Sequence, residues 1–306
     1  MDYKKLIPSQ DTRLRILGLT NFIPDEVMIR LQYRIKTGRK LNLKNPQRFT
    51  EKLQWYKLYY RKPIMTQCAD KYAVRDYIIS KGFEDILVPL YGVYERVDEI
   101  DFKQLPDKFV IKTTNGSRTN LLCEDKSKLD LEATRELLNN WLIKRTSKAG
   151  REWPYYNISP RIICEKFLEK DENNDLVDYK FICFDGKIAC VFVNAERYSD
   201  DIMRFGIYSR DFEILPYSRK GLKNTDNRIR KPINFEKMVE IAETLSNEFP
   251  HVRVDLYNIN GKIYFGEMTF FHGSGYIEFD PDEFDFILGE HFQLPFVKDV
   301  QPREAL

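Results

Sequence analysis

Histidine and cysteine, the residues that build zinc sites and disulfide frameworks, are scarce in this chain. It has three histidines among 306 residues, and its five cysteines are odd in number. No two of them have CxxC spacing, and they are Cys68, Cys123, Cys164, Cys183 and Cys190. The sequence therefore argues against a His-rich zinc site, and it favours buried free thiols in a reducing cytosol.

Long apolar runs and an excess of charge of one sign are also missing. No run approaches the roughly 18 apolar residues that a membrane span needs, and residues 1–19 hold no continuous apolar stretch of signal-peptide length. Lys and Arg number 49 against 47 Asp and Glu, a net charge of +2, so no overall field favours nucleic acid or a membrane. We expect a cytoplasmic protein without a membrane span and without a nucleic-acid partner.

What the chain does have is enough apolar residues for a full globular core. It is 42% hydrophobic, 31% charged and 14% aromatic, which excludes disorder of the whole chain. Its length corresponds to roughly two domains at about 150 residues each. The patterns predict a mixed α/β (α+β) protein with a helical region over 1–65, alternating helices and strands over 66–160, and a strand-richer region over 161–306.

Two amphipathic helices are predicted from capping signals and from the spacing of apolar residues. Pro24 opens the first helix and Gly38 closes it. Its apolar stripe consists of Val27, Met28, Leu31 and Ile35. The second helix runs over 131–143, and its inward face consists of Leu131, Leu137, Leu138, Trp141 and Leu142. Shorter patterns predict a helix over 70–82 and a strand over 87–90.

Two hairpins are predicted where a glycine-containing dipeptide separates strand-like runs. Asp-Gly at 185–186 lies between two such runs, and Asn-Gly at 260–261 lies between two more. The second hairpin also carries charged residues on both of its strands. It is therefore the most informative segment of the sequence.

The charged residues of the second hairpin share a face only for one length of its turn. A two-residue turn at 260–261 would place Asp255 and Glu267 on opposite faces. A three-residue turn over 259–261 changes the register and brings Glu267 opposite Arg253. The four side chains that then share a face are Arg253, Asp255, Glu267 and Thr269. We therefore expect the three-residue turn.

Two interpretations of this charged face stay open. The carboxylates can form a structural ion pair with Arg253, or they can hold a hard cation. Oxygen ligands without Cys or His would select Mg²⁺ over zinc, with phosphate oxygens in the remaining positions. His272, in the flexible loop that follows, is interpreted as a polar surface residue.

A second candidate site is the polar loop that follows the strand predicted at 109–112. Its small residues Gly116 and Ser117 would let backbone N–H groups approach phosphate oxygens, and Lys112 and Arg118 would add positive charge. An ordinary surface turn is the alternative. The loop lacks the GK[ST] ending of a Walker loop.

Two further segments carry weaker signals: Asp70-Lys71 at a predicted helix start, and the run EKFL at 165–168 after a strand. Taken in order with Lys112 and the acidic hairpin, they resemble the motifs of the ATP-grasp superfamily. That resemblance implies two α+β subdomains that clasp ATP, after a small helical N-terminal region. Residues 66–160 would carry the phosphate loop, and 161–306 the adenine linker and the magnesium hairpin.

Within that superfamily the chain resembles the TupA-like ATP-grasp family of bacterial surface-polysaccharide and teichuronopeptide biosynthesis. The resemblance covers roughly residues 45 to 295. The segments that carry it are FTEKLQW at 49–55, ADK at 69–71, FVIK at 109–112, DYKF at 178–181 and EMTF at 267–270.

The resemblance implies a role for each matching residue. Those implied to bind ATP are Lys71, Lys112, Gly116, Ser117, Arg118, Glu165, Lys166, Leu168 and Asp178. The lysines would contact the phosphates, the linker would bind adenine, and Asp178 would bind the ribose. Asp255 and Glu267 would hold Mg²⁺, with Thr269 where many ATP-grasp enzymes have asparagine. Arg253 would stabilise the charge that develops during the reaction.

The activity implied by the resemblance is that of a carboxylate–amine ligase using Mg-ATP. A carboxylate attacks the γ-phosphate to give an acyl phosphate and ADP, and an amine then displaces phosphate. The family's association with polymers of uronic acid and glutamate implies that an amino acid or amine is joined to a uronic-acid carboxylate. An ATP-grasp kinase and a non-catalytic ATP-binding module are alternatives. So is a glycosyltransferase, whose DxD-like motif would be DPD at 280–282.

A basic segment between Tyr217 and Lys231 is a candidate surface for an anionic glycan. It holds one acid, Asp226, and six basic residues, Arg219, Lys220, Lys223, Arg228, Arg230 and Lys231. A solvated charged loop is the alternative.

Overall fold

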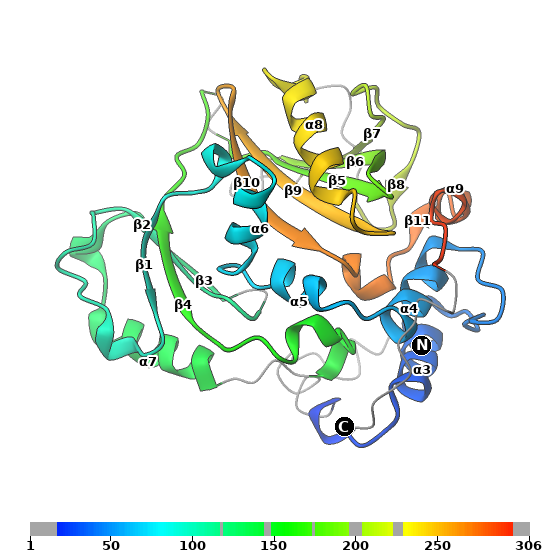
Figure 1. Ribbon diagram of the computed structural model, residues 1–306, viewed down its shortest axis with the longest axis horizontal. Helices are drawn as coiled ribbons and strands as arrows, with labels where there is room; N and C mark the ends of the chain where they lie inside the picture. Colours follow the sequence, from blue (N-terminus) through cyan, green and yellow to red (C-terminus); the bar gives the residue numbers. More distant parts are fainter. Residues whose placement is uncertain are drawn as a thin grey trace.

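Two antiparallel β-sheets form the frame of the protein (Figure 1). The computed structural model describes residues 17–116, 119–143, 148–172, 175–195, 204–222 and 229–295. The four-stranded sheet has the order β1-β4-β2-β3, where the strands are β1 (Leu90–Tyr94), β2 (Phe109–Thr113), β3 (Asn120–Cys123) and β4 (Ile162–Lys166).

The five-stranded sheet has the order β10-β9-β5-β6-β7 and holds the charged hairpin at one edge. Its strands are β5 (Asp178–Phe184), β6 (Lys187–Ala195), β7 (Arg204–Tyr208), β9 (Val252–Ile259) and β10 (Lys262–Thr269). A short two-stranded sheet pairs β8 (Ser218–Arg219) with β11 (Phe279–Asp280). The chain passes from the first sheet to the second between β4 and β5, so the segment that follows the predicted boundary at residue 160 still contributes one strand to the first sheet.

Helices cover both sheets and fill the space between them. They are α3 (Asp25–Thr37), α4 (Phe49–Tyr59), α5 (Pro63–Ala69), α6 (Val74–Ser80), α7 (Leu131–Ile143), α8 (Phe235–Ser246) and α9 (Glu283–His291). In Figure 1, α7 lies by the four-stranded sheet, α8 crosses the five-stranded sheet, and α5 and α6 lie between the two. The larger core joins α8, the five-stranded sheet and α4, and a smaller one lies under α7.

The two predicted amphipathic helices form over the expected residues, but their buried faces differ from the prediction. Helix α3 ends at Thr37, and Gly38 follows in the left-handed region with φ 73°. Its buried side chains are Met28, Ile29, Gln32 and Tyr33, while Val27, Leu31 and Ile35 are 56%, 51% and 48% exposed. The polar residues face inward because they have partners: Gln32 donates to Ala149 O at 2.8 Å, and the Tyr33 hydroxyl lies 3.0 Å from that of Thr50.

Helix α7 likewise contacts the sheet through fewer residues than its apolar pattern indicates. Leu138 is fully buried, whereas Leu131 and Leu137 are 44% and 39% exposed. The strand predicted over 87–90 begins only at its last residue, since a short helical turn over Glu84–Ile86 precedes it. All five cysteines are buried and free, as predicted.

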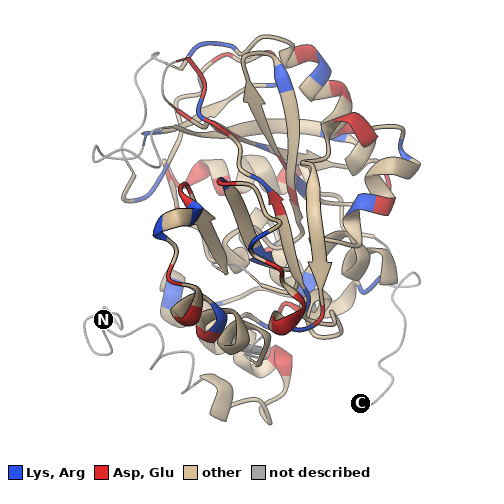
Figure 2. Ribbon diagram, turned by 90° about the vertical axis from the view of Figure 1, so that its left-hand side faces the viewer, with Lys and Arg blue, Asp and Glu red and all other residues tan. Residues whose placement is uncertain are grey.

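Acidic and basic side chains lie close together across the described chain. In Figure 2 acidic and basic positions alternate along the helix ribbons, and both occur on the strands in the middle of the view. Among the described residues, no helix combines the length and the apolar character that a membrane span requires. The division into regions at residues 65 and 160 stays a prediction.

Helix α9 packs against the start of α4 at a position where only glycine fits. A Cβ added to Gly289 would overlap the carbonyl oxygen of Gln47 and would lie 3.0 Å from Phe49 N. Nearby, Asp285 accepts from the Thr50 amide at 2.9 Å and from its hydroxyl at 2.8 Å. These contacts join segments at opposite ends of the sequence.

We predict that Gly289→Ala destabilises the protein by about 1–3 kcal/mol. Alanine normally stabilises a helix relative to glycine by about 1 kcal/mol, so the steric overlap reverses the usual sign. Urea unfolding measures the effect, with Glu290→Ala at the exposed neighbouring position as the control. A stabilised Gly289→Ala variant would contradict the packing described here.

Candidate active site between the two sheets

The charged hairpin reaches its one-faced arrangement through a bulge and not through a longer turn. Its turn has two residues, Asn260 and Gly261, both with positive φ (51° and 88°). The register then shifts between Phe265 and Glu267, which leaves Gly266 as the extra residue. The predicted three-residue turn is therefore wrong, although the predicted shared face is correct.

The bulge also changes which residues lie opposite one another. Glu267 lies opposite Asp255, and Thr269 lies opposite Arg253, whereas the expected register placed Glu267 opposite Arg253. Glycine relieves a tight contact at the bulge, since a Cβ on Gly266 would lie 3.0 Å from Asp255 O. The backbone that carries the two acids is thus in tight contact at this point.

Arg253 is the centre of a buried network of charges on this face. Its Nε and Nη2 contact the two carboxylate oxygens of Asp255 at 2.6 and 2.7 Å, and Nη2 also contacts Glu267 Oε1 at 2.8 Å. Lys180 Nζ bridges Asp178 at 2.6 Å and Asp255 at 2.5 Å. Three carboxylates and two cations therefore contact one another directly in this network.

Glu267 is the accessible member of the network. Its side chain is 44% exposed, whereas that of Asp255 is 3% exposed. Arg253 and Thr269 both bond to Oε1 of Glu267, so Oε2 makes no hydrogen bond to the described residues. Burial opposes ionisation of Glu267, but nearby cations, Arg253 first and Lys71 next, outweigh it and hold the pKa of that carboxyl at about 2.

His272 lies in this network and not on the surface, contrary to its sequence interpretation. It is 4% exposed, and its Nδ1 contacts Arg253 Nη1. Burial, and then the neighbouring positive charge of Arg253, hold the pKa of the ring well below its usual range. The imidazole is therefore neutral and accepts a hydrogen bond from the arginine.

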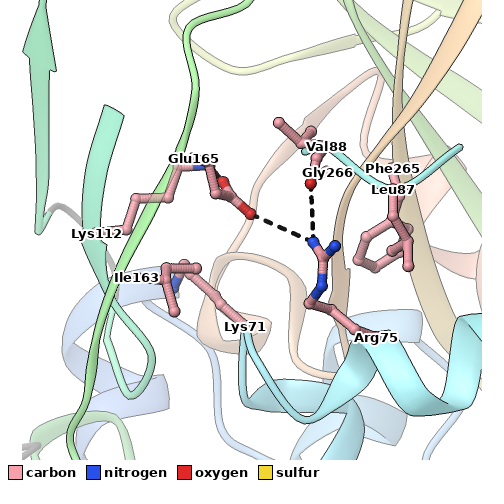
Figure 3. Close-up of a pocket in the computed structure, with 9 residues that line it drawn as sticks. All are labelled: Lys71, Arg75, Leu87, Val88, Lys112, Ile163, Glu165, Phe265 and Gly266. Carbon is pink, nitrogen blue, oxygen red and sulfur yellow. Dashed lines mark hydrogen bonds and ion pairs between the residues drawn. The ribbon is translucent and has the colours of Figure 1, made fainter. Parts of the chain in front are cut away.

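A pocket with two lysines opens beside the bulge of this hairpin. Its lining residues are Lys71, Arg75, Leu87, Val88, Lys112, Ile163, Glu165, Phe265 and Gly266 (Figure 3). Glu165 accepts from Lys112 Nζ at 2.8 Å and lies 3.9 Å from Arg75 Nη1. Gly266 thus belongs both to the bulge and to the pocket wall, so the pocket and the acidic hairpin are contiguous.

Lys71 reaches the pocket from a capped turn between α5 and α6. The side chain of Asp70 accepts from the amides of Tyr72 at 2.7 Å and Ala73 at 3.1 Å, and it pairs with Arg161 at 3.0 Å. Lys71 Nζ contacts the carbonyl of Gly116 in the predicted phosphate loop. Burial lowers the pKa of Lys71. The helix predicted to start at Asp70 starts at Val74 instead, because Asp70 caps this turn.

The predicted adenine linker continues from the central strand of the four-stranded sheet. Glu165 is paired across the sheet with Leu90 and Val110. Lys166 is exposed and Leu168 is half-buried beyond the strand. Asp178, the predicted ribose ligand, is buried and pairs with Lys180, and it does not line the pocket. Ser117 and Arg118 lie outside the described residues.

Three of the predicted glycan-binding residues lie within the described part of the chain. Arg219 is half-buried with its guanidinium 6.0 Å from the Phe205 ring, and Lys220 pairs with Glu278 at 3.0 Å. Arg230 is exposed. Two further predicted residues, Lys223 and Arg228, lie outside the described part of the chain.

The sequence did not predict three residues of this site: Lys180, Arg75 and His272. Alternation along β5 places Lys180 on the same face as Asp178, which the sequence could have revealed. Arg75 and His272 show their role only through contacts between distant segments. The DPD run gives no metal motif, since Asp282 pairs with Arg48 at 2.8 Å and also contacts Arg39.

Together these features define two sheets with a lysine-lined pocket between them and an Arg-Asp-Glu hairpin at its wall. A sequence model of the family described as TupA-like ATPgrasp matches residues 51–293. The chain therefore belongs to the TupA-like ATP-grasp family, and the predicted fold class is confirmed.

Solved structures with a similar fold include ligases. D-alanine–D-alanine ligase from Bacillus anthracis, complexed with ATP, is 15% identical over 66% of this chain, with a TM-score of 0.41. L-amino acid ligase from Bacillus licheniformis is 12% identical over 83% of this chain, with a TM-score of 0.44. The chain spans 54% and 57% of those two proteins, respectively. A search of curated proteins found no significant match.

We predict that Gly266→Ala destabilises the protein by about 1–3 kcal/mol, because its Cβ would press on the Asp255 backbone. If the bulge is lost, Glu267 moves to the other face of the sheet. Urea unfolding measures this cost, with Gly18→Ala as the control, since a Cβ there meets nothing within 4 Å. Equal stabilities of the two variants would contradict the tight bulge.

The depressed pKa of Glu267 predicts a specific acid sensitivity. Its pKa of about 2 in the folded protein is below the ordinary 4.5, so ionised Glu267 stabilises the fold above pH 4.5, and this contribution is lost as the pH falls toward 2. Glu267→Gln should therefore show a shallower fall of unfolding free energy between pH 4.5 and 2 than the wild type. Exposed Glu240→Gln serves as the control, and parallel curves for wild type and Glu267→Gln would contradict the prediction.

Proposed function

We propose that the protein is an ATP-dependent carboxylate–amine ligase that works through an acyl phosphate. This proposal rests on one observation: the lysine pocket and the Arg253 network adjoin each other at the bulge. Phosphoryl transfer depends on positioning and on neutralising phosphate charge rather than on a protein nucleophile. Lysines beside an arginine and accessible acid provide groups of that kind in one place.

Magnesium fits the acidic hairpin through its carboxylates. Asp255 and Glu267 lie directly opposite each other, and Glu267 offers Oε2 at a half-exposed position. Hard carboxylate oxygens suit Mg²⁺. Thr269 would be a third and weaker ligand, since its hydroxyl donates to Glu267 at 3.2 Å and keeps its oxygen lone pairs. When bound, Mg²⁺ would neutralise phosphate charge.

The residues predicted to bind ATP would then have the following tasks. Lys71 and Lys112 bind the ATP phosphates, and Glu165 holds Lys112 in place through its 2.8 Å contact. Gly116, with Ser117 and Arg118, covers the phosphates. The segment from Glu165 through Lys166 to Leu168 would bind adenine, and Asp178 the ribose.

The proposed reaction has two steps. A carboxylate oxygen of the substrate attacks the γ-phosphorus, the bond to the ADP oxygen breaks, and an acyl phosphate forms. The amine nitrogen then attacks the acyl carbon, the bond to phosphate breaks, and the amine loses a proton to solvent. Arg253 stabilises the charge on the oxygens in transfer.

The proposed carboxylate belongs to a uronic acid, and the amine to an amino acid or related compound, in cytoplasmic steps of surface-polysaccharide synthesis. Family membership supports this substrate class. Arg219 supports it too, because its guanidinium is half-buried, lies 6.0 Å from the Phe205 ring and would offer a positive charge to a carboxylate. Lys220, Lys223, Arg228 and Arg230 would extend the contact to a polymeric acceptor.

We expect ADP release from Mg-ATP to require both an acid and an amine. The assay supplies pooled uronic acids and oligouronides, with and without pooled amino acids. Release with acids alone would indicate a kinase instead, and ATP binding without release would indicate a binding module. Consumption of a sugar nucleotide without ATP would indicate a glycosyltransferase.

The same assay tests the magnesium residues. Asp255→Asn and Glu267→Gln should each lower Mg-dependent turnover about 100-fold or more, while circular dichroism shows an intact fold. Thr269→Val keeps the shape and removes only the hydroxyl, and it should have a much smaller effect. Full activity of either carboxylate variant would refute the metal assignment.

A further inference from the structure

The loop that follows the charged hairpin is an unusual piece of backbone. Gly273, Ser274 and Gly275 have consecutive positive φ values of 54°, 57° and 69°. Ser274 is the only non-glycine of the three, and left-handed backbone at such a residue persists where the surroundings hold it. His272 begins this loop, and its ring points back to Arg253.

Helix α4 of the N-terminal region holds this loop in place. Gln54 Nε2 donates to the carbonyls of Ser274 at 3.0 Å and Gly275 at 2.8 Å. Lys57 Nζ donates to Ser274 at 2.9 Å and to Gly150 at 3.0 Å. Both side chains are fully buried, so the loop carbonyls have fixed donors in place of water. Burial lowers the pKa of Lys57 to about 8.

The contacts that run from helix α4 through this loop end at the hydrogen bond between His272 and Arg253. Arginine has donors only, so Nδ1 of His272 is the acceptor and the ring proton is on Nε2. The ring is fixed by packing on Phe192, with the centroids 5.3 Å apart. Besides burial, the nearby positive charges of Arg253, Arg219 and Lys180 lower the pKa of the ring. A neutral acceptor is therefore the form that this site favours.

We propose that His272 is a positioning residue for Arg253, and that helix α4 sets its place through Gln54 and Lys57. Asp255 and Glu267 engage Nε and Nη2 of the guanidinium, and His272 engages Nη1. The imidazole thereby fixes the rotation of the guanidinium plane at the edge that the acids leave open. This inference rests on the proposed function, in which Arg253 stabilises the transferring group.

Two substitutions at His272 separate positioning from packing. His272→Leu removes the acceptor, and His272→Asn keeps an oxygen that can accept from Arg253. We expect His272→Leu to lower kcat for ADP release about 100-fold, the usual cost of a small misplacement, with the KM for ATP nearly unchanged. His272→Asn should recover most of that loss.

His251 provides the matched control for this experiment. It is fully buried, burial lowers its pKa to about 3, and its Nδ1 bonds to the Cys183 carbonyl rather than to Arg253. His251→Leu should lower thermal stability as His272→Leu does, yet leave kcat per folded molecule within about threefold, since no catalytic group is displaced. Equal kcat losses in the two variants would overturn the proposal.

Nitrogen NMR of the histidine rings gives a readout that does not need turnover. In the wild type His272 should be neutral, with Nδ1 unprotonated and hydrogen-bonded. Gln54→Met, which keeps the length of the side chain and removes its donors, should shift these nitrogen signals and lower kcat. A protonated Nδ1, or signals unmoved by Gln54→Met, would overturn the inference. If the wild type releases no ADP with any substrate pool, the ligase proposal fails, and the nitrogen signals still decide the contact.

Discussion

Burying the Arg253 guanidinium costs several kcal/mol unless acceptors surround it, and the whole site is arranged around that requirement. Asp255 takes two of its contacts, Glu267 takes another, and His272 takes the remaining edge. Lys180 pairs with both Asp178 and Asp255, and it balances negative charge that Arg253 alone does not neutralise. The acids are held in place by cations, and the open oxygen of Glu267 is the point at which the network meets solvent.

The ion-pair and metal interpretations of this hairpin are compatible for the same reason. The structure contains the ion pair between Arg253 and Asp255, and Lys180 contacts the same aspartate. Glu267 keeps an oxygen without a hydrogen bond among the described residues, beside a pocket with Lys71 and Lys112. A charged ligand of either sign therefore finds a partner at this wall, which is the property a site for metal-bound phosphate requires.

Local signals in the sequence were sufficient for the position of the hairpin at 260–261 and for the limits of α3 and α7, and insufficient for what depends on tertiary contact. Asn260-Gly261 predicts its hairpin because both residues accept positive φ. The bulge at Gly266 was missed, since it depends on the approach of the Asp255 backbone from the partner strand. The face of α3 was misjudged because Gln32 and Tyr33 have partners on other segments. The motifs predicted Lys71 and Lys112 as site residues. The contacts of His272 join residues 19 or more positions apart, so no local pattern indicates its place in the network.

The contacts of helix α4 have a consequence for the order of assembly. Gln54 and Lys57 bond to Ser274, 220 and 217 residues further along the chain, and Thr50 bonds to Asp285 over 235 residues. Contacts between residues so far apart in the sequence form late in folding, because closing the loop between them first costs conformational entropy. During synthesis α4 therefore leaves the ribosome long before its partners exist. Until they arrive, Gln54 and Lys57 remain hydrated, and the loop at 273–275 lacks the donors that hold it in the folded protein.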